Sequence, residues 1–376
     1  MTPGIRKKLD VILKEDVKAL DEVVVVGYGT MKKRDLVGAV DHINSDALEG
    51  RAAPSLTRSL QGQIPNLNIS MRDGKPDRGA TYNVRGTTSI GAGGSALVLI
   101  DGVEGDPNSV NPQDIESVSV LKDASSAAVY GARGTFGVVL ITTKNAKKGG
   151  VKVDYSGSVS FSQRTVKPKL VTNGLQWTDD FVESFVNNKG TMPTSINNIF
   201  PYSPEWHEEL RRHNANPDLP EVQINENTGK YEYYGNTDWD KLLYKDVVSG
   251  TDHSMSITGG NDIASFYVSG RYFLQDGIYR QNSDDYNRAN FRAKGTIQIK
   301  PWLSIDNNFD MMHKTYHYPL ISYDQTLTVQ RNMEQQGYPM AVLYNPDGSL
   351  TYSSVYSGVG DFYSNSSYQD QTTLQY

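Results

Sequence analysis

The chain has 376 residues and no cysteine, and its 37 Lys and Arg against 43 Asp and Glu give a formal net charge of −6. This mild and well-mixed charge excludes a strongly basic nucleic-acid binder, and the missing cysteines exclude disulfides, thiolate metal sites and cysteine nucleophiles. A mean hydropathy of −0.52, with no apolar run near the ~18 residues of a membrane helix, excludes a helical membrane protein.

Residues 1–20 do not have the pattern of an export signal. Arg6, Lys7 and Lys8 give a basic start, but the following VILKEDVKALDE is interrupted by charged residues every few positions. A signal peptide requires an apolar core of about 7–15 residues. We therefore expect the chain as written to lack a signal peptide.

The segment Leu20–Thr30, LDEVVVVGYGT, predicts an extended strand. Four successive valines favour β structure, and Gly27 and Gly29 follow them directly. A strand followed by G-x-G also begins a dinucleotide-binding fingerprint, but Lys32 stands where the third glycine belongs and no helical pattern follows. Two interpretations stay open, namely an unpaired strand that docks a partner and an internal strand of the next domain.

Residues 80–145 predict a small mixed α/β domain. Short β-branched runs at Leu97–Ile100, Val118–Leu121 and Val138–Thr143 are separated by Asp-Gly and glycine-rich turns. Asp123 and Gly131 are placed to begin and end one short helix between the last two runs. Four motifs follow one another here: VRG at 84–86, LIDGV at 99–103, SVLKDASSAAVYG at 119–131 and GVVLITTK at 137–144.

After Gly150 the pattern changes to strict alternation, and we place a domain boundary there. In Val151–Ser162 the odd-numbered residues are apolar, aromatic or glycine, and the even-numbered residues are Lys, Asp or Ser. Such period-two alternation indicates strands with one apolar and one polar face. The alternation returns at 254–258, 264–274, 291–300 and 303–311, and a further strand begins at Tyr368.

The connections between these strands alternate in length. Segments 163–249, 276–285 and 314–367 are long or intermediate, whereas 259–262 and the turn at Pro301 are short. Short turns on one side and long loops on the other are typical of outer-membrane β-barrels. Strands of about ten residues also match the ~9–11 that cross a bilayer at a tilt. A soluble sandwich has similar strands, but these connections favour the barrel.

Together these features resemble the plug domain and early barrel strands of TonB-dependent outer-membrane transporters of the SusC/RagA branch. The four motifs stand in the family's order and spacing, and TDW at 237–239 and HSMSITGGNDIASFYVSGRYFLQDGIY at 253–279 are similar to its early strands. The resemblance implies an α+β plug domain followed by the first strands of an antiparallel transmembrane β-barrel. That barrel is incomplete, with five to six strands where the family has about 22.

The resemblance also implies domain boundaries and site residues. Residues 1–20 would be the remnant of a preceding immunoglobulin-like, carboxypeptidase-regulatory-like domain and a linker, 21–150 the TonB box and plug domain, and 151–376 the N-terminal part of the barrel. The TonB box would add as a strand to the periplasmic TonB complex, and its residues would be Glu22, Val23, Val24, Val25 and Val26. The characteristic plug residues would be Arg85, Gly86, Asp101, Gly102, Lys122, Asp123, Tyr130, Gly131 and Arg133.

The implied activity is active import of a nutrient across the outer membrane of a Gram-negative cell. The implied partners are the TonB energy-coupling complex, a SusD-like surface lipoprotein as a lid, and outer-membrane lipid. A glycan or oligosaccharide is the default substrate and an oligopeptide the next. Two other readings stay open: a truncated, non-functional piece of such a transporter, and a secreted all-β binding module, which does not account for the plug motifs.

The first long connection carries aromatic residues that could contact a substrate or partner, because aromatic faces bind apolar patches of sugars and peptides. Alternatively, these rings pack the loop against itself. The residues are Trp177, Tyr202, Trp206, Tyr233 and Trp239.

Enzyme chemistry finds little support in the sequence. The six histidines form no recognised metal-ligand spacing, and Gly91–Ser95 lacks the ending of a phosphate-binding loop. Paired carboxylates such as Asp179 and Asp180 lie in loop-like sequence, where solvated charge is the usual role. We expect no catalytic residue, no metal site and no cofactor.

Overall fold

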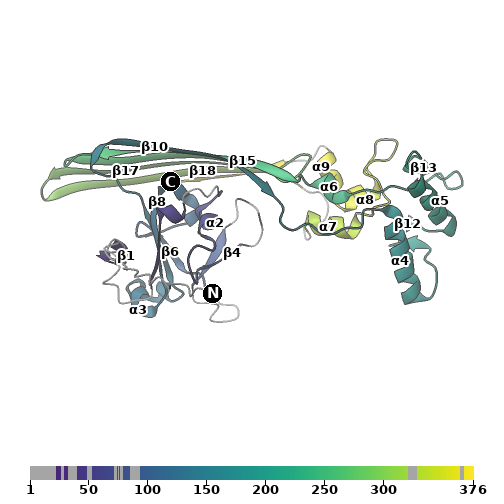
Figure 1. Cartoon of the computed structure of the whole chain (residues 1–376), viewed down its shortest axis with the longest axis horizontal. Coiled ribbons are helices and arrows are strands. Elements are labelled where there is room, and N and C mark those ends of the chain that lie inside the picture. Colours follow the sequence, from purple (N-terminus) through teal and green to yellow (C-terminus); the bar gives the residue numbers. More distant parts are fainter. Residues whose placement is uncertain are drawn as a thin grey trace, which may run out of the picture.

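The computed structural model describes residues 40–48, 53–71, 79–84, 94–320, 328–364 and 368–376, the single residues Gly74 and Pro76, and the backbone of 23–26 and 29–32. A small mixed α/β domain, here called the plug, lies against one face of a long six-stranded sheet, here called the wall (Figure 1). Helices gather beyond one end of the wall.

The plug is built on a five-stranded sheet in the order β3-β8-β9-β6-β7, in which β6 and β9 are parallel and the other neighbours antiparallel. Leu56, Leu60, Ile115, Val118 and Val120 are fully buried in its core. Its strands are β3 (Val40–Asn44), β4 (Asn68–Met71), β5 (Ala80–Asn83), β6 (Leu97–Ile100), β7 (Val103–Glu104), β8 (Ile115–Leu121) and β9 (Val138–Thr143). Its α-helices are α2 (Leu56–Leu60) and α3 (Ala124–Ala127), and its 3₁₀ turns are Ser45–Ala47, Pro107–Ser109, Pro112–Asp114 and Ala128–Gly134.

Local signals in the sequence account for two turns of the plug. The Asp123 carboxylate accepts a hydrogen bond from the backbone N–H of Ser126 at 2.6 Å and so begins α3, as predicted. Asp101 and Gly102 have φ of 48° and 87° and join β6 to β7 in a two-residue turn. Such a turn requires positive φ at both residues, which explains the Asp-Gly pair.

The valine run forms β1 (Val23–Val26), which pairs antiparallel with β2 (Gly29–Lys32) in a two-stranded hairpin. The prediction of an extended strand is confirmed, but the expectation that it is unpaired is wrong, because β2 occupies one of its edges. The hairpin is separate from the five-stranded plug sheet. Glu22 lies outside the described residues.

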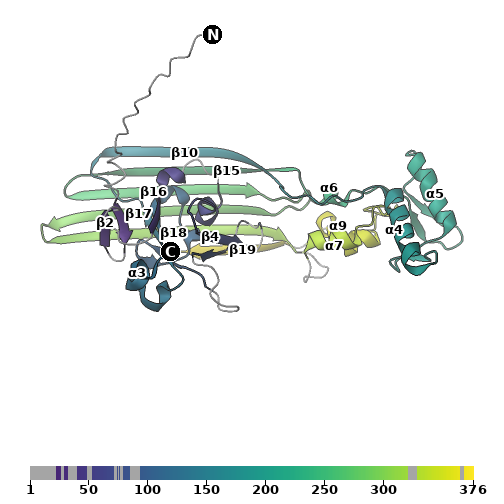
Figure 2. The same cartoon turned by 60° about the horizontal axis from the view of Figure 1, so that its bottom comes forward.

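The wall is an antiparallel meander in the order β10-β15-β16-β17-β18-β19 (Figure 2). Its strands are β10 (Gly149–Gln163), β15 (Val247–Gly260), β16 (Ala264–Asp276), β17 (Asp285–Lys300), β18 (Leu303–Pro319) and β19 (Tyr368–Gln375). The first five are 13 to 17 residues long, so the prediction of about ten residues was too short. Backbone pairing continues past the clearly alternating residues, because polar strand ends pair as well as apolar ones.

The two faces of the wall differ as the alternation predicts. On the face away from the plug, Val159 and Phe161 of β10 are 62% and 75% exposed, whereas Arg271 on the plug face is 4% exposed. The register places Ser158 opposite Asp252, so these two polar residues of neighbouring strands share the plug face. No helix in the described parts of the chain is long and apolar enough to span a membrane.

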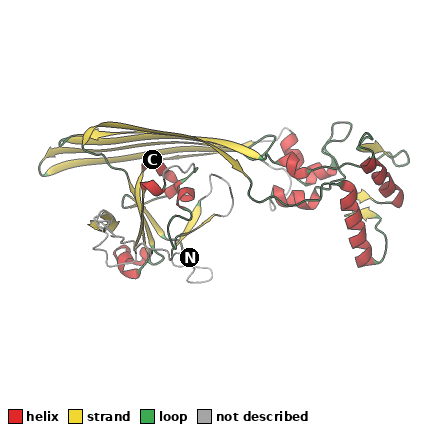
Figure 3. Cartoon of the chain, viewed as in Figure 1, coloured by secondary structure: helices red, strands yellow, loops and turns green. Residues whose placement is uncertain are grey.

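The long connections fold into a compact body at one end of the wall, here called the loop unit (Figure 3). Its helices are α4 (Gly174–Lys189), α5 (Pro204–Ala215), α6 (Trp239–Leu243), α7 (Val329–Gln336), α8 (Tyr352–Tyr356) and α9 (Val359–Tyr363). Its hairpins pair β11 (Ser195–Ile196) with β12 (Phe200–Pro201) and β13 (Val222–Ile224) with β14 (Tyr231–Tyr233). The short turns between β15 and β16 and between β17 and β18 lie at the other end.

Candidate functional site

The plug-facing side of β15 to β18 presents polar and charged side chains to the plug, and this contact is here called the plug–wall interface. Most of its wall residues are buried although many of them are charged or amidic, so the buried ones need partners; Lys294 and Asp310 are half-buried and Asn308 is exposed. They are Asp252, Ser254, Tyr267, Ser269, Arg271, Arg288, Asn290, Arg292, Lys294, Asn308 and Asp310.

Arg288 of β17 is the centre of the interface, with 1% of its surface exposed. Its guanidinium donates hydrogen bonds to the carbonyl oxygens of Pro54, Ser109 and Val110 at 3.1, 3.0 and 3.1 Å. The Asn290 amide donates to the Ser109 carbonyl at 2.7 Å. A planar, always charged fork suits several carbonyls at once. Arg288 and Asn290, here called the Arg288 clamp, therefore hold two separate plug segments.

Arg271 of β16 binds the plug beside the Arg288 clamp, at the residue before Pro54. It forms a two-pronged ion pair with Asp252 of β15 at 2.8 and 2.7 Å and donates to the carbonyl of Ala53 at 2.7 Å. Arg271 and Asp252 are both nearly buried. The ion pair offsets the cost of burying the arginine, and the remaining hydrogen bond binds the plug.

Asp101, from the predicted LIDGV motif, connects the plug to β17 and β18. Its carboxylate accepts hydrogen bonds from Thr143 N–H and Oγ1 at 2.9 and 2.6 Å, from Lys294 Nζ at 2.9 Å and from Asn308 Nδ2 at 3.1 Å. Burial opposes ionisation of Asp101, but the Lys294 charge and the Thr143 hydrogen bonds outweigh it and lower its pKa below the ordinary value. Asp101 is therefore the anionic member of this contact.

Asp114 makes the contact with β16. Its carboxylate accepts hydrogen bonds from Tyr267 OH at 2.9 Å and from Ser269 Oγ at 2.7 Å, and Arg292 Nε lies 3.8 Å away. Burial raises the pKa of Asp114 above its ordinary value, because these hydrogen bonds and cations offset only part of the lost hydration. The pKa values of the two plug aspartates, Asp101 and Asp114, are thus shifted in opposite directions.

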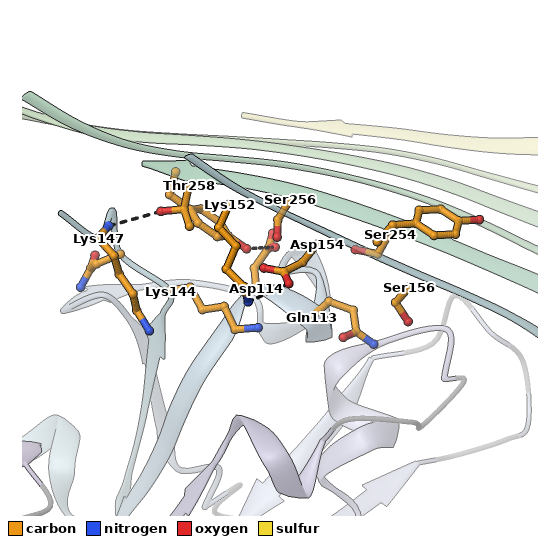
Figure 4. A pocket seen from close by; sticks show the side chains of 13 residues that line it. Gln113, Asp114, Lys144, Lys147, Lys152, Asp154, Ser156, Ser254, Ser256 and Thr258 are labelled. Carbon is orange, nitrogen blue, oxygen red and sulfur yellow. Dashed lines mark hydrogen bonds and ion pairs between the residues drawn. The ribbon is translucent and has the colours of Figure 1, made fainter. Parts of the chain in front are cut away.

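A polar cavity of about 420 Å³ lies between the plug and the β10–β15 side of the wall (Figure 4). The plug side contributes Gln113, Asp114 and Lys144, with Lys147 from the segment leading into β10. The wall side contributes Lys152, Asp154, Tyr155 and Ser156 of β10, Ser254, Ser256 and Thr258 of β15, and Tyr267 of β16. Its volume lies within the range of small-molecule sites, about 300–1,000 Å³.

The other predicted plug residues mainly stabilise the plug itself. Lys122 forms an ion pair with Asp41 on the neighbouring strand β3, and Arg133 forms one with Glu104 of β7. Tyr130 packs on a second apolar cluster, and Gly131 has a φ of 58°, which favours glycine. Arg85 and Gly86 lie outside the described residues.

The predicted aromatic residues lie in the loop unit. Trp239 and Trp206 are 3% and 8% exposed, and Trp239 Nε1 donates to the Tyr338 carbonyl at 3.0 Å. Tyr202 OH lies 3.0 Å from His207 Nδ1, Tyr233 OH donates to Asn345 at 2.8 Å, and Trp177 stacks on Phe181. These rings pack the first long connection against the last one. Their contact with a substrate or partner stays a prediction.

Glycine permits the closest of these loop contacts. A Cβ on Gly174 would lie 2.3 Å from the carbonyl oxygen of Gly235 and 2.9 Å from the Cα of Met340. Backbone hydrogen bonds of 2.8 Å also join Gly235 to Met340 and Thr237 to Pro339. Two connections that are distant in sequence therefore form one core.

The sequence reasoning did not single out the wall residues that bind the plug. The alternation placed Arg271, Arg292 and Lys294 on a polar face but indicated no partner for them. Arg288 precedes the stretch from Phe291 onward in which the alternation is clear. Continued back through Tyr286, Arg288 and Asn290, the same period places Arg288 on the polar face of β17.

Comparisons with known proteins agree with this arrangement. Residues 32–138 match the family model described as TonB-dependent Receptor Plug Domain. The chain is 34% identical over 290 residues to the TonB-dependent receptor SusC of Bacteroides thetaiotaomicron, covering 74% of this chain and 25% of that protein. It is 29% identical over 375 residues to a TonB-dependent receptor of Formosa agariphila, covering 97% of this chain and 33% of that protein.

Among solved structures, the RagAB peptide importer in its open-open state matches with a TM-score of 0.64 and 24% identity, over 88% of this chain and 36% of that one. This likeness concerns the fold. The chain spans a quarter to a third of the length of the curated relatives above. Those relatives are named receptors and not enzymes.

Proposed function

In the part that it covers, this chain is a SusC/RagA-type TonB-dependent receptor, and on that premise we propose that it takes part in active import of an oligosaccharide across a Gram-negative outer membrane. The observation that carries the proposal is a plug bound to the polar face of an antiparallel wall whose other face is apolar and exposed. A soluble binding module would bury that apolar face, whereas a wall in lipid presents it to the hydrocarbon.

The proposed direction of transport follows from the two ends of the wall. The short turns would lie on the periplasmic side and the loop unit outside the cell, as in outer-membrane barrels. The loop unit would then meet an incoming substrate first, together with a SusD-like lipoprotein as its lid. Oligopeptide is the second candidate substrate, since the RagAB importer is described as a peptide importer.

Energy coupling would use β1 as the TonB box, with Glu22 and Val23–Val26 adding as a strand to TonB. β1 pairs with β2 along one edge, so TonB would either add to its other edge or displace β2. Either route uses backbone hydrogen bonds of β1. A proline in β1, which has no backbone N–H, should therefore block coupling.

The test is uptake of labelled oligosaccharides, with maltoheptaose as a neutral probe and oligogalacturonate as an acidic one, by cells that express the full protein containing these residues. Val24→Pro, which removes a backbone donor, should abolish uptake, while Val24→Ala keeps the donor and should retain it. A defined oligopeptide mixture serves as the competing substrate. TonB-independent uptake, or uptake of the peptides alone, would contradict the proposal.

A further inference from the structure

The plug is bound to the wall unevenly. Strands β16 and β17 hold it by the Arg288 clamp, by Arg271 and through Asp101 and Asp114, and these contacts are 2.7 to 3.1 Å long. On the other side, Asn111 Nδ2 donates to Ser254 Oγ of β15 at 3.3 Å. Among the described residues, no hydrogen bond or ion pair joins β10 to the plug.

The weakly bound side contains one of the cavities between plug and wall. A further one, of about 490 Å³, is lined by Arg58 of the plug and by the loop-unit ends of β10 and β15 to β18. The 420 Å³ cavity lies where β10 and β15 face the plug, and Figure 4 shows Ser254, Ser256 and Thr258 of β15 across from Asp114 and Gln113. Its hydroxyl and ammonium groups face space that water can enter. Separating the plug from the wall here exposes groups that are already polar, so the free-energy cost is small.

On the strongly bound side, separation is costly. Moving the plug from β17 would leave the charge of Arg288 and three plug carbonyls without their partners in a buried contact. The Arg271–Asp252 pair would lose its plug carbonyl as well. A force applied to the plug should therefore open the β10–β15 side first and leave the Arg288 clamp in place.

We propose that solute crosses between the plug and strands β10 and β15, through this cavity, while the plug pivots on the Arg288 clamp. The inference rests on the import function proposed above and specifies where in the wall the passage opens. It assigns no such role to β17 or β18, where another polar cavity is lined by Lys294 and Asn308, both of which hold Asp101. The passage cavity adjoins a single strong contact, that of Asp114 with Tyr267 and Ser269 of β16.

The lining indicates the class of solute that passes. Three lysines face two aspartates, and one of these, Asp154, is paired with Lys152 at 2.7 Å. Lys144 and Lys147 are thus the cations next to the passage, among serine and threonine hydroxyls. Such a surface suits a polyhydroxylated solute that is neutral or anionic, and it disfavours a cationic one.

Two buried serines allow a matched test of the pivot. Ser254, on the cavity side, is 7% exposed, and Ser109, whose carbonyl accepts from the Arg288 clamp, is 6% exposed. The 376-residue chain has no cysteine. Ser254→Cys and Ser109→Cys therefore each give this part of the protein one cysteine to label. Cells expressing each variant in the full protein are treated with a polar maleimide, with and without a protonophore that removes the proton-motive force.

The expected result is that Ser254→Cys is labelled several-fold faster in energised cells, and that Ser109→Cys is protected in both states. Equal labelling of the two would show that the whole plug leaves the wall and would overturn the pivot. Labelling of Ser109→Cys alone would place the passage on the β17 side. No change at either cysteine, in cells that do import the probes, would also overturn the inference.

A second experiment tests the charge of the passage with the variant Lys147→Glu. Lys148→Glu, at the next residue in the sequence, is the control. Lys148 does not line the cavity and pairs with Asp262 on the surface at 3.0 Å. Lys147→Glu should slow uptake of oligogalacturonate more than that of maltoheptaose, and Lys148→Glu should change neither. Equal effects of the two variants would overturn the assignment of the cavity as the passage. Absence of uptake by the unsubstituted protein would instead contradict the proposed function.

Discussion

The loop unit and the plug–wall interface join segments that are distant in sequence by opposite means. The loop unit has an apolar, aromatic core that includes Trp206, Leu210, Trp239 and Met340. The plug–wall interface consists of arginines, aspartates and backbone carbonyls, with Arg288 as its most buried member.

The difference matters because water can replace one kind of contact and not the other. Exposing apolar surface costs about 25 cal/mol per Å², and water offers no compensation. A hydrogen bond that is exchanged for water contributes only about 0.5–1.5 kcal/mol net. The loop unit is thus built to stay closed, whereas the polar contacts of the plug outside the Arg288 clamp can be broken and hydrated when the plug moves.

The loop unit should be most sensitive at Trp239. Trp239→Ala removes a ring that is 3% exposed and a hydrogen bond to Tyr338, and should lower the stability of the loop unit by about 3–5 kcal/mol. Hydrogen exchange of α6 and α7 measures the change. Val166→Ala, in the same connection but 82% exposed, is the control and should have little effect. Equal loosening of the plug would show that the two regions are coupled.

The outer face of the wall extends the comparison to lipid. Val159→Arg places a charge on the exposed apolar face and should cost about 2–4 kcal/mol in vesicles if Val159 lies near the bilayer centre. Ser158→Arg, one residue away, lies opposite Asp252 on the plug face and should be tolerated. Denaturant titration of the full protein in lipid vesicles measures the free energy of unfolding of both variants. Similar losses for the two would contradict the assignment of Val159 to the lipid face and Ser158 to the plug face.

The strength with which the wall binds the plug should depend on the planar shape of the Arg288 guanidinium as well as on its charge. Arg288→Met removes the hydrogen bonds to the carbonyls of Pro54 and Val110 and leaves the Ser109 carbonyl with Asn290 alone, and it should weaken plug binding by about 2–3 kcal/mol. Arg288→Lys keeps the charge but not the fork, and should fall between wild type and Arg288→Met. The urea concentration at which Ser109→Cys becomes reactive reports the change. No difference between lysine and arginine would show that charge alone binds the plug.

The smallest expected effect is that of Asp101, and it depends on pH. The lowered pKa of Asp101 means that folding favours its ionised form, so its contribution is complete above the unfolded pKa of about 3.9 and is lost as pH falls through the lower folded pKa. Asp101→Asn should therefore cost about 1–2 kcal/mol at pH 7 and progressively less as the pH falls below about 3.9. Urea titration at several pH values measures this.

The control for this variant is Asp262→Asn. Asp262 is exposed and pairs only at the surface with Lys148, so its replacement should change stability little at any pH. A cost of Asp101→Asn that does not fall at all as the solution is acidified would mean that packing, and not charge, connects Asp101 to β17.

Much of the local structure could be predicted from the sequence, because it depends on near neighbours. The Asp101-Gly102 turn, the Asp123 cap and the alternation from Val151 onward each follow from φ preferences or from the two-residue period of a strand. The order of short and long connections likewise indicated an antiparallel meander. The fold class that the resemblance implied, a plug followed by antiparallel barrel strands, is confirmed by the structure and the comparisons.

Other features depend on partners that the sequence does not reveal. Alternation shows that Arg271 and Arg292 share a polar face, but not that Ala53 or Asp101 lies across from them more than 150 residues away in sequence. The aromatic residues of 163–249 gave no sign of the segment around Met340 that completes their core.

The sequence by itself determined the strands, their faces and the turns, since these arise from each residue's own conformational preferences and from its immediate neighbours. Only the tertiary structure decided that the plug is clamped at β17 and leaves a cavity at β10. These features depend on which buried charged side chain pairs with which backbone carbonyl. Such pairs form only after segments that are distant in sequence have packed together.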